Sequence, residues 1–103
     1  MNLNKLMKQA QQMQAGMQKA QEDLAKQTVE SSVAGGKVSV TATGAGDVTN
    51  ISIDPAIIDP EDADFLETVL LQGVQEAITK AKDLSNQEMG KLTGGMNLPN
   101  MGL

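Results

Sequence analysis

The stretch from Leu3 to Leu24 repeats apolar residues at alternating steps of three and four positions. This spacing predicts a helix with one narrow apolar seam, because side chains three and four apart lie on the same helix face. The seam residues are Leu3, Leu6, Ala10, Met13, Met17, Ala20 and Leu24. The position of Met13 and Met17 in the seam favours helix packing over an adaptable partner-binding stripe. Such a helix extends about 33 Å, so part of it should project beyond the small sheet that follows.

Apolar and polar residues alternate from Val29 to about Ile53, which predicts three short strands. Gly35 and Gly36 separate the first two strands, and a glycine-rich stretch at 44–47 separates the next two. Glycine accepts the positive φ angles of tight hairpins, and neither stretch has the spacing of a phosphate-binding loop. The inward-facing residues include Val38, Val40, Ile51 and Ile53. We therefore expect an antiparallel meander with one apolar face that a helix must cover.

A second helix is predicted from the Asp59-Pro60 dipeptide to about Leu92. Asp59 suits the N-cap and Pro60 the first helical position. The apolar positions, which include Leu66 and Leu70, are dense at first and then thin out. The first half should therefore lie on the sheet and the second half should project. Gly73 costs about 1 kcal/mol relative to alanine, so it marks either a close backbone approach or a tolerated defect.

Together these elements predict an α+β fold in the order helix, three-stranded antiparallel meander, helix, as one domain over residues 1–92. Residues 93–103 are rich in helix breakers and are expected to form a flexible tail. With one Phe and no Trp or Tyr, the core is small, and the meander leaves two open edges. A second copy is therefore expected. The residues expected in the core or the dimer interface are Val38, Val40, Ile51, Ile53, Leu66 and Leu70.

The composition excludes several kinds of chemistry. The chain has no Cys and no His, which removes disulfides, thiol catalysis and the usual nitrogen and sulfur metal ligands. The acidic cluster from Asp59 to Asp64 lacks the pattern of a calcium loop and fits helix capping instead. We expect no enzyme activity, no cofactor and no metal. Without a signal peptide or an apolar run near 18 residues, the protein is expected to be cytoplasmic and not membrane-bound.

The net charge of −5 is distributed unevenly along the chain. Residues 1–21 contain Lys5, Lys8, Lys19 and no acid, whereas residues 44–76 contain eight acids and no base. A partner senses the field within a Debye length of about 10 Å, so the basic helix can meet a polyanion despite the acidic total. The three lysines either solubilise the helix or contact nucleic-acid phosphates.

Five segments are together similar to one known family. They are the Lys-Gln-Ala-Gln-Gln-Met run at 8–13, the strand at 36–41, Ile-Ser-Ile-Asp-Pro at 51–55, the helix at 65–77 and Gly-Met-Asn-Leu-Pro at 95–99. Over nearly its whole length the chain resembles the YbaB/EbfC family of bacterial nucleoid-associated proteins. The resemblance implies a tweezer-like homodimer whose projecting helical arms bind double-stranded DNA. It also implies a place in the nucleoid, a broad influence on gene expression and no small-molecule substrate.

The resemblance also implies which residues contact DNA. These are Lys5, Lys8, Gln9, Gln12 and Lys19 of the first helix, with Lys80 and Lys82 of the second. Many relatives carry arginines around the helices, but this chain has no Arg, so bidentate readout of guanine is absent. We expect weak, largely sequence-independent binding to phosphates. The alternative is a protein-interaction module, a chaperone or adaptor, that receives a partner helix on its seam without binding DNA.

Overall fold

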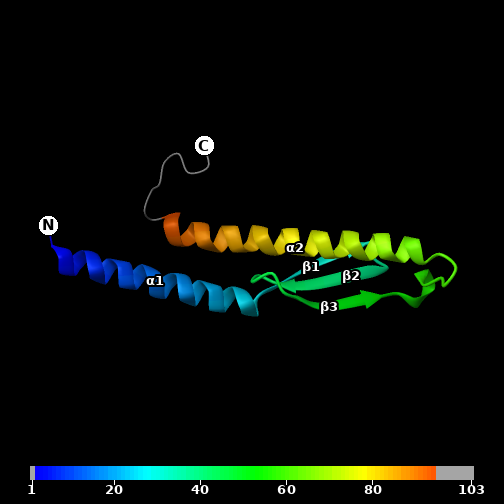
Figure 1. Ribbon diagram of the computed structural model, residues 1–103, viewed down its shortest axis with the longest axis horizontal. Coiled ribbons are helices and arrows are strands. Elements are labelled where there is room, and N and C mark those ends of the chain that lie inside the picture. Colours follow the sequence, from blue (N-terminus) through cyan, green and yellow to red (C-terminus); the bar gives the residue numbers. More distant parts are fainter. Residues whose placement is uncertain (1, 95–103) are drawn as a thin grey trace.

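A computed structural model describes residues 2–94, and its elements follow the predicted order of helix, three strands and helix (Figure 1). The elements are α1 Leu3–Lys26, β1 Thr28–Val33, β2 Val38–Thr43, β3 Val48–Ile53, the short 3-10 helix η1 Pro55–Ile57 and α2 Ala63–Gly94. α2 extends beyond its predicted end at Leu92, and the remainder of the predicted tail, 95–103, lies outside the described residues. The molecule is elongated, measuring 71 × 28 × 17 Å.

The three strands form one antiparallel sheet in the order β1-β2-β3, which confirms the predicted meander. The register pairs Val40 of the central strand with Ser31 of β1 and with Ile51 of β3. Residues that are paired directly point to the same face of a sheet, so these three share a face. Val38 lies on that face too, and both it and Val40 are fully buried.

α2 packs on this face and completes the core. The buried apolar residues of this core between the sheet and α2 are Val33, Val38, Val40, Ala42, Val69, Ala77 and Ala81. Gly73 lies at the closest approach, because a Cβ there would be 3.0 Å from Cγ2 of Val40. The buried hydroxyl of Ser31 donates a 2.6 Å hydrogen bond to the carbonyl of Gly73, which satisfies a polar group that water cannot reach. Gly73 is therefore a point of close backbone approach and not a tolerated defect.

The expectation that one helix covers the whole apolar face is wrong at β3. α2 packs mainly on β1 and β2. A helix about 10 Å wide spans roughly two strands spaced about 4.8 Å apart, so the third strand stays outside its footprint. Ile51 shares the core face but is 44% exposed, and Ile53 is only half-buried. Leu66 and Leu70 are also half-buried, and Leu70, like Ile53, packs against the buried core as expected.

The start of α2 differs from the prediction by one turn. α2 begins at Ala63, and Oδ1 of Asp62 accepts a hydrogen bond of 3.4 Å from the backbone N–H of Phe65, as an N-cap does. Asp59 instead accepts from the N–H of Glu61 at 2.9 Å within the preceding turn. Both aspartates have the chemistry of an N-cap, and in the structure Asp62 caps α2.

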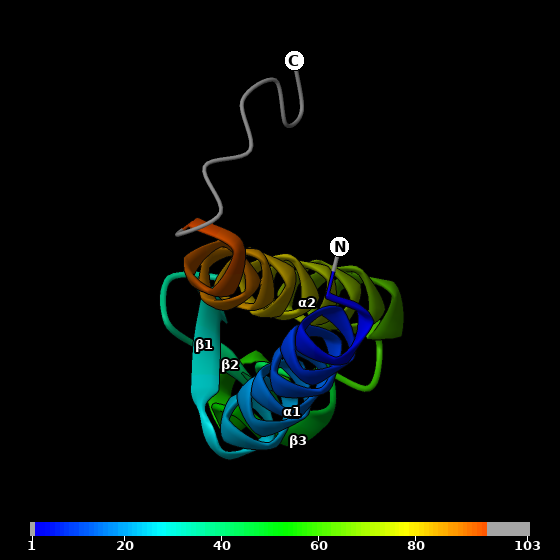
Figure 2. The ribbon, with the colours of Figure 1, turned by 90° about the vertical axis from the view of Figure 1, so that its left-hand side faces the viewer.

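α1 joins the rest of the molecule near its C-terminal end. Leu24, the buried residue of α1, is 2% exposed, and a Cβ on Gly44 would lie 2.8 Å from its Cδ2. Figure 2 shows that α1 and α2 cross instead of running parallel, so they meet over a limited length, with Gly16 opposite Leu92. The predicted seam is therefore only partly packed. Met13 and Met17 are each 44% exposed, so this part of the seam is about half covered.

Candidate nucleic-acid interface

The polar side of α1 carries a row of lysines. At 100° per residue, Lys5, Lys8, Lys19 and Lys26 fall within an arc of about 60°. Lys5, Lys8 and Lys26 are exposed and form no ion pair with any residue in 2–94. Sequence reasoning missed Lys26, although the helical spacing that it shares with Lys8 and Lys19 could have identified it. We call these four residues the lysine row.

The N-terminal half of α1, which we call the arm, is exposed on all sides. The side-chain Oδ1 of Asn2 accepts a hydrogen bond of 3.1 Å from the backbone N–H of Lys5 and caps the helix, so the first turn is held without an acid. Gln9 and Gln12 are exposed on the same helix. Amide groups can donate hydrogen bonds to phosphate oxygens, as lysines do. The arm thus offers a flank of donors without a competing carboxylate.

Lys19 differs from Lys5 and Lys8 because it already has a partner. Its Nζ lies 3.7 Å from Oδ2 of Asp23, one turn further along α1. Both side chains remain well exposed, so the pair is weak and an anion from solution can displace the carboxylate. Lys19 can therefore contribute to an anion-binding surface, though less readily than the unpaired lysines.

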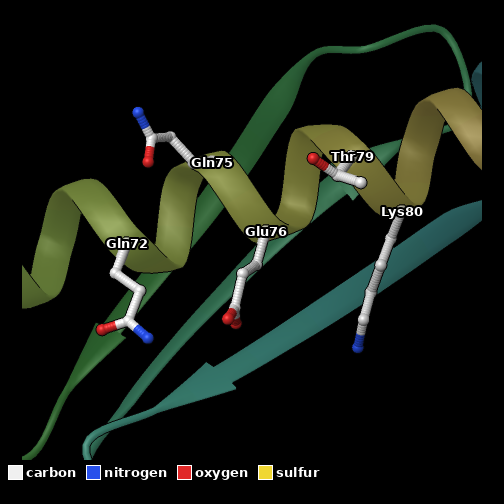
Figure 3. A pocket seen from close by; sticks show the side chains of 5 residues that line it. All are labelled: Gln72, Gln75, Glu76, Thr79 and Lys80. Carbon is white, nitrogen blue, oxygen red and sulfur yellow. The ribbon is translucent and has the colours of Figure 1, made fainter.

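The structure does not bring Lys80 and Lys82 together with the lysine row. Lys80 donates a 2.8 Å hydrogen bond from Nζ to the backbone carbonyl of Glu30, on the edge strand β1. Figure 3 shows Glu76 and Lys80 extending from α2 towards the strands; they line an open polar hollow of about 520 Å³ with Gln72, Gln75 and Thr79. Lys82 is exposed two residues further on, about 200° around the helix from Lys80. Lys80 therefore serves as the hydrogen-bond donor to a backbone carbonyl on the edge strand of the sheet.

The acidic residues gather away from the arm. The segment 54–67, which holds most of the acids of the middle of the chain, lies at the opposite end of the molecule from the start of α1 (Figure 1). Hydrogen bonding from the N–H of Ala56, and then from the ammonium of Lys37, lowers the pKa of Asp54 below its ordinary value of 3.8. A Debye length of about 8 Å is short compared with the molecule, so the acids do not cancel the field of the arm.

Other kinds of site find no support in the part of the chain that the structure describes. Within 2–94, acidic residues are nowhere grouped in threes around a position where a metal ion could bind. Neither helix, over those residues, is both long and apolar enough to cross a bilayer.

Both the sequence and the fold are similar to those of known proteins. Residues 1–96 match the YbaB/EbfC DNA-binding family. A protein of Akkermansia muciniphila named nucleoid-associated protein is 57% identical over 99 residues, covering 96% of this chain and 95% of that protein. One of Ruminiclostridium cellulolyticum with the same name is 48% identical, covering 97% and 88%. The crystal structure of uncharacterized protein HP0035 from Helicobacter pylori superposes with a TM-score of 0.79 at 18% identity, over 89% of this chain and 97% of that one, and shows the fold alone.

Proposed function

The chain belongs to the YbaB/EbfC DNA-binding family, and on this premise we propose that it binds the phosphate backbone of double-stranded DNA through the lysine row of a homodimer. The family relationship makes it a nucleoid-associated DNA-binding protein and not an enzyme. The nucleoid is accordingly its proposed place in the cell, with an effect on gene expression that follows from coating or bending DNA.

One observation carries the proposal: Lys5 and Lys8 are exposed and unpaired among the described residues, on an arm without acids. Their ammonium groups would release counterions from DNA when they contact phosphates. With no Arg in the chain, the side chain best suited to reading guanine is missing. Binding should therefore depend strongly on salt and little on sequence.

The second copy is proposed to bind the β3 surface, which we define as Ile51 and Ile53 of β3 with Leu66, Leu70 and Val74 of α2. Val69, Gly73, Ala77 and Ala81 are the buried residues of α2 and form one row along it. The residues one position after this row lie on one flank of α2, and those one position before it, including Lys80, lie on the other flank. Because Lys80 reaches β1, the flank of Leu66, Leu70 and Val74 lies on the side of β3. These half-buried side chains and the exposed Ile51 form a joint apolar surface suited to a two-fold contact.

The DNA-binding proposal is tested by fluorescence anisotropy with two 30-base-pair duplexes of unrelated sequence over a salt series. If the four residues of the lysine row in each of two copies contact phosphates, log affinity should fall against log salt with a slope of about −7. The double variant Lys5→Gln/Lys8→Gln should flatten the slope to about −3.5. The control Lys37→Gln removes a lysine that pairs with Asp54 and lies outside the lysine row, and it should change binding much less than Lys5→Gln alone. No binding by the wild type at low salt, or equal losses in Lys37→Gln and Lys5→Gln, would contradict the proposal.

The dimer is tested by light scattering of Ile51→Asp. Ile51 is exposed enough for a single copy to tolerate the change, but a buried carboxylate would disrupt an interface there. Ser52→Asp adds the same charge to the opposite face of β3, and this variant should keep the wild-type mass. A wild-type monomer would refute the homodimer, and a dimeric Ile51→Asp would refute this surface.

The exposed seam of the arm favours a second candidate function. Leu3, Leu6 and Met13 lie uncovered at helical spacing, which suits a partner helix in a chaperone or adaptor. A single stoichiometric partner whose capture survives Lys5→Gln/Lys8→Gln but not Leu6→Gln, with no DNA binding by the wild type, would support that function instead.

A further inference from the structure

Two ion pairs lie where the arm meets α2. On α1, Nζ of Lys19 lies 3.7 Å from Oδ2 of Asp23, and on α2, Nζ of Lys91 lies 3.4 Å from Oε1 of Glu88. All four side chains line one hollow of about 290 Å³ between the two helices. Lys19 and Lys91 therefore border the same hollow, each paired with a carboxylate from its own helix.

The ion pair on α2 follows the rules of helix stability. Glu88 precedes Lys91 by three residues, and Lys91 lies in the last turn, where a cation is favourable to the helix dipole. Asp23 on α1 follows neither rule. It comes after its lysine instead of before it, which is the weaker order for an i, i+4 pair. It also lies one residue before Leu24, close to the C-terminal end of α1, where a negative charge opposes the dipole.

Burial does not strengthen the ion pair of Asp23 either. Its side chain is 53% exposed and that of Lys19 is 75% exposed, so the ion pair is a solvated contact that holds little structure together. What Asp23 does change is the charge available to an anion at the hollow, because its carboxylate neutralises a lysine of the lysine row. A phosphate that approaches Lys19 must displace Asp23 and is repelled by it.

We propose that Asp23 restrains DNA binding by competing with phosphates for Lys19, which keeps the affinity of the arm low. The inference rests on the proposed DNA-binding function and describes the regulation of that same surface. The carboxylate and the phosphodiester are alternative acceptors for one ammonium, so removing the carboxylate leaves Lys19 free for DNA. A weak, easily reversed contact suits a protein that must coat DNA without blocking it.

The test is the affinity of Asp23→Asn for a 30-base-pair duplex at low salt, with Glu22→Gln as the matched control. Glu22 lies at almost the same height on α1, about 100° around the helix, and forms no ion pair within 2–94. Both variants remove one negative charge beside the lysine row, and only Asp23 forms an ion pair with Lys19. Asp23→Asn should bind about threefold to tenfold tighter than wild type, and Glu22→Gln less than twofold tighter.

A double-mutant cycle separates competition at Lys19 from a general charge effect. In a Lys19→Gln background, Asp23→Asn should gain no more affinity than Glu22→Gln does. Circular dichroism should show that all variants keep the helix content of the wild type. Equal gains for Asp23→Asn and Glu22→Gln, or a gain that persists without Lys19, would overturn the inference while leaving the DNA-binding function intact. A wild type that does not bind DNA at low salt would instead overturn the proposed function.

Discussion

The two long helices contrast in how they are held. α2 is fixed to the sheet along its middle by buried residues, a close backbone approach at Gly73 and a hydrogen bond from Ser31. α1 is held near its C-terminal end by Leu24, and its N-terminal half projects away from the sheet and α2. The two long helices of one chain therefore have different structural roles: α2 forms one side of the core, and α1 forms a projecting arm. The contrast explains why stability and DNA binding should separate in this protein.

The largest expected effect comes from comparing two leucines of the same seam. Leu24→Ala should lower the free energy of unfolding by about 3 kcal/mol, because it removes a buried side chain from the joint. Leu6→Ala, on the exposed arm, should change it by less than about 0.5 kcal/mol. Urea unfolding followed by circular dichroism measures both. Equal losses would mean that the arm is buried along its length and that the contrast is false.

A second comparison uses two glycines of α2. Gly73→Leu should cost about 2 kcal/mol, because a Cβ at this position already meets Val40 at 3.0 Å and Val33 at 3.4 Å. Gly90→Leu should instead raise the free energy of unfolding by up to about 0.8 kcal/mol, since a Cβ there meets nothing within 4 Å and leucine favours the helix. The measurement is again urea unfolding. A stable Gly73→Leu would show that α2 can lift from the sheet.

The hydrogen bond between sheet and helix is tested by neighbouring serines of β1. Ser31→Ala should lower the free energy of unfolding by about 1 kcal/mol, because it removes the buried hydrogen bond from the Ser31 hydroxyl to the carbonyl of Gly73. Ser32→Ala, on the exposed face, should have an effect below about 0.5 kcal/mol. Thermal unfolding by calorimetry resolves the difference. Matching midpoints for the two variants would mean that the bond adds nothing to the attachment of α2.

These contrasts were only partly available from the sequence. The 3.5-residue repeat of α1 and the alternation of the strands predicted the elements, because both patterns are local. The repeat alone could not distinguish the buried Leu24 from the exposed Leu6, because the burial of each leucine depends on where α2 ends and crosses α1. The same limit applies to the site. Lys5, Lys8 and Lys19 were identified from their charge and from the family resemblance, whereas the partner of Lys80, the backbone carbonyl of Glu30, emerged only from the packing of α2 against β1.

The smallest expected effect concerns the end of the sheet farthest from the arm. The pKa of Asp54 is lowered by the Ala56 N–H and then by Lys37, so its contribution to stability is present above pH 3.8 and is lost as pH falls through the lower folded value. Asp54→Asn should therefore make acid unfolding below pH 4 less steep. Lys37→Gln leaves the Ala56 bond in place and should give an intermediate slope. Identical acid profiles for wild type and Asp54→Asn would contradict this assignment.

The sequence by itself determined the order of the elements, the turns and the separation of basic and acidic segments, because these depend on neighbours along the chain. The tertiary structure decided which apolar residues are covered. One helix is wide enough to cover two strands, so β3 and its residue Ile51 remain exposed. α2 crosses α1 near Gly16, so the N-terminal half of α1 is not covered by α2. The widths and crossing of packed elements leave no periodic trace in the sequence, and for that reason only the fold revealed these two surfaces.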